Sequence, residues 1–215
     1  MKPYYETELG VLYHGDCLEI MPMLEPVDLV LTDPPYGISY DTSHNKYKNG
    51  ISRDAATWDV EPFNPTHLLK LDIPTILWGG NCFASRLPDY PGWLCWLKTA
   101  RNEAKIRQAD MELAWTNFIK RPQTYALLWI GAYKGGESGQ RNVHPTQKPI
   151  SLMMWCIKIS KTDGVILDAY IGSGTTAIAC ERLNRRWIGI EIEEKYCEIA
   201  AKRIEKENQQ LKLFA

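Results

Sequence analysis

The chain has 215 residues, of which 45% are hydrophobic and 24% are charged. This length and composition predict one compact α/β domain over residues 1–215 and exclude a disordered tail. The formal net charge of −1 excludes a uniformly basic coat for nucleic acid. A local basic face can still bind phosphate, and residues 81–150 carry ten Lys or Arg against five Asp or Glu.

The six cysteines are scattered, without a Cys-x-x-Cys pair or a Cys/His cluster. The sequence therefore indicates neither a structural zinc site nor a disulfide framework. The first ten residues lack the apolar core of a signal peptide, and no apolar run approaches the ~18 residues that a membrane helix needs. We expect no metal, no membrane contact and a reducing cytoplasm.

The N-terminal part of the chain predicts two strands, the first ending in an acid and the second followed by one. Leu9–Asp16 is typical of a short strand, and residues 17–24 of a short helix. Residues 27–32 form a nearly continuous apolar run, which predicts a strand covered on both faces and stopped by Asp33 and two prolines. The polar stretch 37–60 follows, and a loop of this length in a compact domain is usually functional or mobile.

The rest of the chain predicts alternating strands and helices. Aromatic and β-branched residues indicate strands over 75–78, 93–97, 111–115 and 125–130. A buried helix is expected over 149–160, with Pro149 in its first turn. Strand, helix, strand and helix then follow over 165–170, 174–183, 187–192 and 193–209. This last βαβα unit implies a parallel sheet with a right-handed crossover.

A glycine loop lies between the first strand and helix of that unit. Gly172-Ser173-Gly174 leads directly into the helix, so backbone N–H groups and the positive helix end face whatever occupies the turn. Glu191 follows nineteen positions after Gly172, an offset that suits hydrogen bonds to ribose hydroxyls. The pattern also satisfies the dinucleotide fingerprint of an NAD-dependent oxidoreductase. Asp168, however, would repel a pyrophosphate and attract a cationic amino acid group.

A second motif, Asp33-Pro34-Pro35-Tyr36, directly follows the buried strand over 27–32. The two prolines restrict the loop, so the Asp33 carboxylate and the Pro34 carbonyl can both point outward. Acceptors of this kind can bind the N–H groups of an exocyclic amino nitrogen and free its lone pair for attack on a sulfonium methyl. Tyr36 supplies a face on which an extruded base could stack. The alternative is a plain turn that ends a strand.

These two motifs, together with His144-Pro-Thr-Gln-Lys-Pro149, resemble the amino-methyltransferase family of DNA-modifying enzymes. The catalytic motif precedes the glycine loop, an order similar to the β-class of that family, and the resemblance spans Leu12 to about Ile204. It implies a doubly wound, Rossmann-like fold for S-adenosylmethionine-dependent methyl transfer. It also implies a mostly parallel sheet, a circularly permuted motif order and a bacterial or phage-infected host cell.

The resemblance also implies roles for individual residues. Asp33, Pro34, Pro35 and Tyr36 would form the catalytic loop that binds the target base in double-stranded DNA. S-adenosylmethionine would contact the following residues: Asp16 and Cys17 at its adenine, Glu191 at its ribose, and Asp33, His144, Thr146, Lys148, Asp168, Tyr170, Gly172, Ser173, Gly174 and Thr175 elsewhere. Adenine N6 is the expected target, with cytosine N4 as the alternative. A non-catalytic DNA-binding module that keeps the cofactor fold is a further alternative.

Two features depart from the family pattern. Asp168-Ala169-Tyr170 stands where Asp-Pro-Phe is common, which should loosen the loop slightly. The expected target-recognition insertion, about 116–143, is short, so we expect relaxed recognition or help from a second subunit. The chain is expected to be a monomer or a homodimer. In a doubly wound sheet, ligands bind at the carboxyl ends of the strands where the strand order reverses. The loops at Asp33 and Gly172 should therefore meet there.

Overall fold

The part of the chain that the structure describes is built on one nine-stranded sheet. The computed structural model describes residues 1–37, 61–98, 109–129 and 147–213. The strands of the sheet are ordered β1-β2-β9-β8-β3-β4-β6-β5-β7. They are β1 (Tyr5–Glu6), β2 (Gly10–His14), β3 (Leu29–Thr32), β4 (Thr75–Trp78), β5 (Gly92–Leu97), β6 (Met111–Thr116), β7 (Gln123–Ala126), β8 (Ile166–Asp168) and β9 (Trp187–Glu191). Strands β1 and β6 run opposite to the other seven, so the sheet is mostly parallel.

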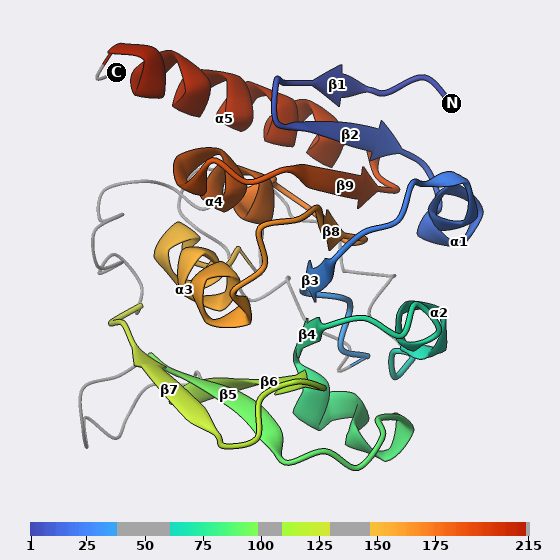
Figure 1. Cartoon of the computed structure of the whole chain (residues 1–215), viewed down its shortest axis with the longest axis vertical. Helices are drawn as coiled ribbons and strands as arrows, with labels where there is room; N and C mark the ends of the chain where they lie inside the picture. Colours follow the sequence, from blue (N-terminus) through green and yellow to red (C-terminus); the bar gives the residue numbers. More distant parts are fainter. Residues whose placement is uncertain (38–60, 99–108, 130–146, 214–215) are drawn as a thin grey trace, which may run out of the picture.

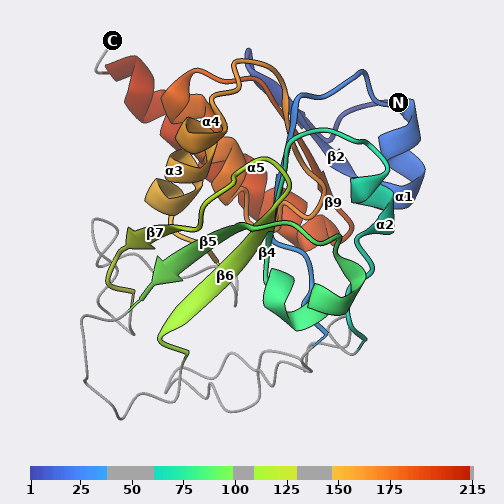
Figure 2. The ribbon, with the colours of Figure 1, turned by 60° about the horizontal axis from the view of Figure 1, so that its bottom comes forward.

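Helical segments cover both faces of the sheet. They are α1 (Cys17–Ile20), η1 (Met21–Met23), α2 (Thr66–Leu69), η2 (Gly80–Arg86), α3 (Ile150–Ser160), α4 (Thr175–Leu183) and α5 (Glu194–Leu213). Figures 1 and 2 show α3 and α4 on one side of the sheet, and α1 and α2 on the other. Among the described residues, no helix is long and apolar enough to cross a membrane.

Alternation along the buried strands explains this layering. In β3, Leu29 and Leu31 pack in the apolar cluster that includes residues of α3, α4 and α5. Val30, between them, packs in the opposite cluster with Ile20 of α1 and Leu68 of α2. Side chains alternate across a strand, so a continuous apolar run buries both faces at once. The expected doubly wound, Rossmann-like architecture is confirmed.

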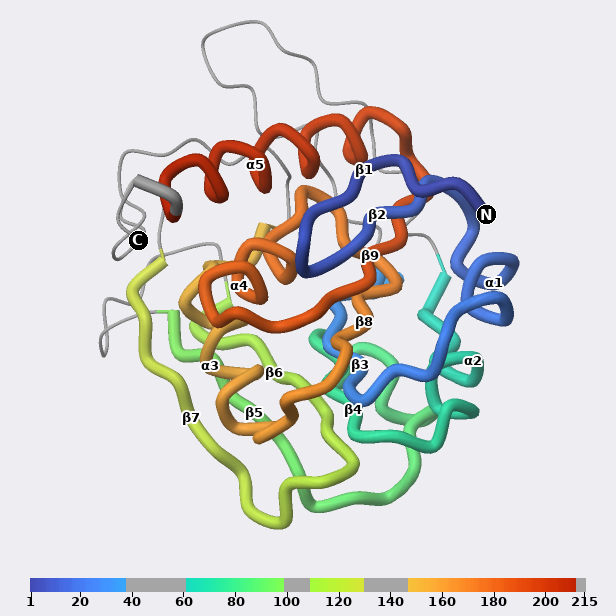
Figure 3. Tube along the Cα trace, turned by 45° about the horizontal axis from the view of Figure 1, so that its top comes forward, coloured from blue at the N-terminus to red at the C-terminus, as the bar shows by residue number. Residues whose placement is uncertain are grey.

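The strand order reverses between β8 and β3. From β8 the sheet grows through β9 to β2, and from β3 it grows in the other direction through β4. The two central strands therefore come from opposite parts of the chain, and Figure 3 shows the C-terminal β8 and β9 beside the N-terminal β2 and β3. This is the permuted order that the sequence predicts. It places the loop after β3 next to the loop after β8.

Several boundaries differ from the sequence prediction. The strand expected over 125–130 is β7, Gln123–Ala126, so it begins and ends earlier within the described residues. Pro149 is the N-cap of α3, with extended geometry, and not a residue of its first turn. The short elements β1, α2 and η2 were not predicted, because each has too few residues to show a periodicity.

Candidate active site

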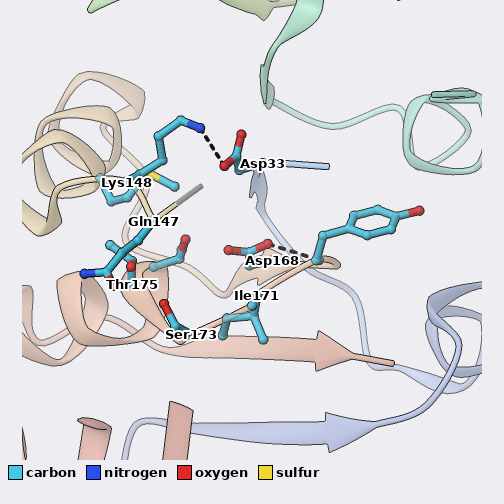
Figure 4. A pocket seen from close by; sticks show the side chains of 11 residues that line it. Asp33, Gln147, Lys148, Asp168, Ile171, Ser173 and Thr175 are labelled. Carbon is cyan, nitrogen blue, oxygen red and sulfur yellow. Dashed lines mark hydrogen bonds and ion pairs between the residues drawn. The ribbon is translucent and has the colours of Figure 1, made fainter. Parts of the chain in front are cut away.

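The two loops at the strand reversal line one pocket. Its lining residues are Asp33, Gln147, Lys148, Met153, Asp168, Tyr170, Ile171, Gly172, Ser173, Thr175 and Thr176. The Thr32 hydroxyl, at the end of β3, donates a hydrogen bond of 2.6 Å to the Asp168 carboxylate at the end of β8. Figure 4 shows the Asp33 and Asp168 side chains on the same side of this pocket, with Ser173 and Thr175 below them. The predicted meeting of the loops after β3 and β8 is therefore present.

The glycine loop has the backbone conformation that glycine favours. Gly172 and Gly174 have φ values of 52° and 82°. A Cβ on Gly174 would lie 3.0 Å from the Cβ of Ala200 in α5. The Gly172 N–H donates to the Glu191 carboxylate at 2.8 Å, which ties the loop to the end of β9. These contacts hold the loop against the pocket at the start of α4.

A second pocket lies at the ends of β2 and β9. It is lined by Gly15, Asp16, Cys17, Leu18, Ala169, Tyr170, Ile190, Glu191 and Ile192. The Asp16 side chain accepts a hydrogen bond of 2.8 Å from the N–H of Leu18, so it also caps α1. Glu191 accepts backbone hydrogen bonds at both oxygens, and each oxygen keeps a lone pair for a further donor. Tyr170 lines both pockets, so a two-part ligand could reach from Asp16 to Asp33.

Tyr170 is held in place between these pockets. The Cys17 thiol donates to its hydroxyl at 3.3 Å, and His67 Nε2 of α2 lies 3.0 Å from the same oxygen. Its ring packs edge-on against Phe63, with the ring centroids 5.4 Å apart. Burial lowers the pKa of His67, which favours the neutral ring as an acceptor. The sequence Asp168-Ala169-Tyr170 was expected to loosen the loop slightly. The hydrogen bonds of the Tyr170 hydroxyl oppose this, and a phenylalanine, which has no hydroxyl, could not make them.

An ionic network around the buried Lys148 ammonium includes the Asp33 carboxylate. Lys148 Nζ lies 2.6 Å from Asp33 Oδ2, 2.9 Å from Tyr36 Oη and 3.1 Å from Glu112 Oε2. Tyr36 Oη donates to Asp33 Oδ1 at 2.5 Å, and Glu112 also pairs with Lys98. The Lys148 side chain is only 4% exposed. Burial raises the pKa of Asp33, and the neighbouring Lys148 ammonium opposes that rise.

Gly79 gives Tyr36 room beside this network. Its φ is 72°, and a Cβ built there would lie 2.0 Å from the Tyr36 ring. We expect Gly79→Ala to lower the free energy of unfolding by about 2 kcal/mol, because alanine resists left-handed backbone and the ring has to move. Urea unfolding of the variant and the parent chain measures this difference. Equal free energies of unfolding would show that the position of the Tyr36 ring does not require a glycine at residue 79.

Asp168 is the most deeply buried carboxylate of the site. It is 3% exposed, and burial raises its pKa to about 6. The Thr32 hydroxyl and the Tyr170 N–H donate to its Oδ1 atom, which favours the ionised form. A buried anion with few compensating charges attracts a cationic group. Asp168 can therefore bind an ammonium ligand at neutral pH.

The structure brings most of the predicted site residues together. The first pocket includes Asp33, Lys148, Asp168, Tyr170, Gly172, Ser173 and Thr175, and the second includes Asp16, Cys17, Tyr170 and Glu191. Gly174 is the N-cap of α4, while Pro34 is buried and Pro35 half-buried beside Asp33. His144 and Thr146, residues 38–60 of the polar stretch and residues 130–143 of the expected recognition insertion lie outside the described residues.

Two findings go beyond the sequence prediction. Lys148, expected at the cofactor, directs its ammonium to the Asp33 carboxylate (Figure 4). Glu112 joins the same network, although the sequence indicates it only as one acid within the basic segment 81–150. An acid inside the otherwise apolar strand Met111–Thr116 was the available signal. Within the described residues, no group of three or more His, Cys, Asp or Glu could hold a metal ion.

Solved structures share this fold. A complex of M1.HpyAVI with SAM superposes with a TM-score of 0.55 at 23% identity, over 91% of this chain and 99% of the other. The PvuII cytosine-N4-specific DNA methyltransferase superposes with a TM-score of 0.62 at 17% identity, over 97% and 93%. The architecture is therefore the Rossmann-like fold of S-adenosylmethionine-dependent methyltransferases.

Sequence comparisons find similar proteins among the DNA methyltransferases. A family model described as DNA methylase, for N6 and N4 methyltransferases, matches residues 98–202. Type II methyltransferase M2.DpnII of Streptococcus pneumoniae is 27% identical, over 97% of this chain and 94% of its own length. M2.LlaDCHI of Lactococcus lactis is 28% identical, over 95% and 93%. The chain is thus similar to the N6/N4 family of DNA methyltransferases.

Proposed function

We propose that this chain transfers a methyl group from S-adenosylmethionine to adenine N6 in double-stranded DNA. The transfer is direct and in line, onto a base extruded from the duplex. One observation carries the proposal: the Asp33 carboxylate and the glycine loop at Gly172 line the same pocket. A methyl donor held by the loop and an amino group held by Asp33 would then be neighbours.

The two pockets fit the two ends of this cofactor. Asp16 and Glu191 line the second pocket, where they can accept hydrogen bonds from an adenine amino group and ribose hydroxyls. Asp168 and the glycine loop line the first pocket, where the buried carboxylate can pair with the methionine ammonium. When bound, the cofactor supplies an electrophilic methyl, whose bond to sulfur breaks as its bond to the amino nitrogen forms, leaving a neutral thioether.

The affinity for S-adenosylmethionine should depend on pH through Asp168. Its pKa of about 6 belongs to the free protein, and the ligand ammonium binds the ionised carboxylate. Affinity should therefore stay constant above pH 7 and fall by about tenfold per pH unit below pH 6, because one pKa unit corresponds to about 1.4 kcal/mol. Calorimetry between pH 5 and pH 8 measures this. Affinity that stays level through pH 6 would contradict this role for Asp168.

The loop after β3 would bind the target base. Asp33 and the Pro34 carbonyl accept the two amino protons of the base and direct its nitrogen lone pair to the methyl. Tyr36 offers a stacking face, and base–aromatic stacking contributes roughly 1–3 kcal/mol against the cost of unstacking. The methylated nitrogen has to lose one proton. Asp33 can accept it, because burial raises the pKa of this carboxyl and so favours its protonated form.

Cytosine N4 is the second candidate target, because its amino group would use the same two acceptors. The motif begins with Asp33, whereas both Asp and Ser can begin it in this family, and Asp favours adenine. Long-read modification mapping of DNA from cells that express the chain separates the two. N6-methyladenine at one short sequence motif, absent when Asp33→Ala is expressed, supports adenine. Detection of N4-methylcytosine would identify cytosine as the target in place of adenine. Unmodified DNA would count against both targets.

Residues 1–215 form one methyltransferase domain in this proposal, and residues 116–143 contribute to target recognition. The basic segment 81–150 supplies the phosphate contacts to double-stranded DNA. An NAD-dependent oxidoreductase would need a pyrophosphate at the glycine loop, beside the buried Asp168. Calorimetry that detects NAD binding and no S-adenosylmethionine binding would favour that class instead.

A further inference from the structure

The buried Lys148 ammonium lies between two half-buried carboxylates. Asp33 Oδ2 is 2.6 Å from Nζ on one side, and Glu112 Oε2 is 3.1 Å away on the other. Glu112 comes from β6, opposite Trp96 of β5, while Asp33 follows β3. The other Glu112 oxygen pairs with Lys98. Two ammonium groups and two carboxylates thus balance in a network that is largely shielded from water.

This network occupies the atoms that the target base needs. Asp33 Oδ1 accepts from the Tyr36 hydroxyl at 2.5 Å, and Oδ2 accepts from Lys148. An ammonium is, like the amino group of a base, a nitrogen that presents N–H donors to a carboxylate. Lys148 Nζ therefore stands where the target nitrogen has to bind, and it must withdraw when the base enters.

Withdrawal is possible only if the ammonium keeps a partner. A buried charge that loses its counter-ion costs about 3–5 kcal/mol, which would oppose entry of the base. Glu112 removes that cost, because it already contacts Lys148 and is held on its far side by Lys98. Lys148 can move towards Glu112 and release Asp33 Oδ2 without becoming unpaired.

We propose that Glu112 is a positioning residue for the methyl-transfer reaction, which retains the Lys148 ammonium while the amino group of the target base replaces it on Asp33. The inference rests on the proposed function, because it concerns the same carboxylate and the same base. It assigns Lys148 to the base side of the site and gives Glu112 a role that acts through Lys148.

Removing either charge should alter the ionisation of Asp33 in opposite directions. The groups that face Asp33 are Lys148, Glu112 from β6, Tyr36 on its own loop and Asp168 from β8, with Cys82 of η2 beside Tyr36. The positive Lys148 lowers the pKa of Asp33, and the negative Glu112 raises it. Activity requires ionised Asp33, so it is lost as the pH falls through the pKa of this carboxyl.

The test compares Glu112→Gln, Lys148→Met and the parent chain in pH profiles of kcat, with tritiated methyl transfer to DNA. In E112Q the acid limb should move to lower pH, and kcat at pH 7.5 should fall about tenfold, because Lys148 has lost the partner towards which it moves. In K148M the acid limb should move to higher pH. The affinity of both variants for S-adenosylmethionine should stay within about twofold of the parent value, since neither side chain binds the cofactor in this account.

Glu207→Gln is the matched control. Glu207 also pairs with a cation, Arg182, but on the distant contact between α4 and α5. Its profile should coincide with that of the parent chain. If E112Q does not fold, Glu112→Asp replaces it: the shorter side chain keeps the charge, loses reach to Lys148, and should lower kcat while the acid limb stays in place.

The inference would be overturned by an E112Q profile identical to the parent profile, or by acid limbs that move in the same direction in E112Q and K148M. E112D with the parent kcat would also overturn it. A loss of cofactor affinity in step with activity would likewise overturn it, since that indicates a purely structural role. A parent chain that transfers no methyl group to DNA would instead contradict the proposed function itself.

Discussion

Replacing Asp33 with alanine is expected to reduce methyl transfer to background, by about 10³-fold or more, while the affinity for S-adenosylmethionine stays nearly intact. The substitution removes the carboxylate that accepts the amino protons, and a positioned acid or base contributes roughly 10²–10⁴-fold to a rate. It leaves the Asp168 carboxylate and the glycine loop in place. Tritiated methyl transfer to DNA and calorimetry with the cofactor measure the two effects separately.

The control for this variant is Asp163→Ala. Asp163 is 86% exposed and pairs with Arg185 away from both pockets, so its loss should leave transfer unchanged. Full activity of the Asp33→Ala variant would remove Asp33 from the reaction and end the present assignment of the loop after β3.

Replacing Asp168 with asparagine is expected to weaken S-adenosylmethionine binding by about 10- to 100-fold, because a hydrogen bond to a charged group contributes roughly 1.5–3 kcal/mol. The fall in affinity for S-adenosylmethionine below pH 6 should be absent in this variant. Asp168→Asn should not lower the free energy of unfolding of the free protein at pH 8, because burial disfavours the ionised carboxylate of the parent chain. The parent chain gains stability as the pH falls through about 6, where Asp168 becomes protonated. Asparagine is neutral at every pH.

Calorimetry and thermal unfolding of Asp168→Asn at pH 8 test both parts of this expectation. Glu207→Gln, which makes a half-buried acid neutral, provides the comparison for a site far from the ligand. An Asp168→Asn variant with the parent affinity would show that the ammonium of the cofactor binds elsewhere.

The C-terminal half of the fold could be predicted from the sequence because its signals are local. The apolar run at β8, Gly174 before α4 and the amphipathic, helical spacing of apolar residues in α5 are all signals between near neighbours in the sequence. The same holds for β3, where Pro34 and Pro35 end the strand. Strand β7 was placed too late, because Leu127 and Leu128 continue the apolar pattern beyond Ala126, where the strand ends.

The site could be predicted in part, for the same reason. Asp33 directly follows the buried strand β3 and Asp168 is the last residue of the buried strand β8. The rule for doubly wound sheets places the ends of these two strands together. The partner of Lys148 could not be found this way. Its contacts with Asp33 and Glu112 join residues 115 and 36 positions apart, and the sequence alone does not give the tertiary packing that makes them neighbours.

The measurement that tests the account most directly is mass spectrometry of nucleosides from DNA incubated with the purified chain and deuterated-methyl S-adenosylmethionine. We expect N6-methyldeoxyadenosine that carries the intact labelled methyl group, formed by the parent chain and not by Asp33→Ala. Labelled methyl on a ring carbon, or unlabelled DNA despite tight binding of the cofactor, would contradict the claim that Asp33 and the glycine loop at Gly172 form one catalytic centre.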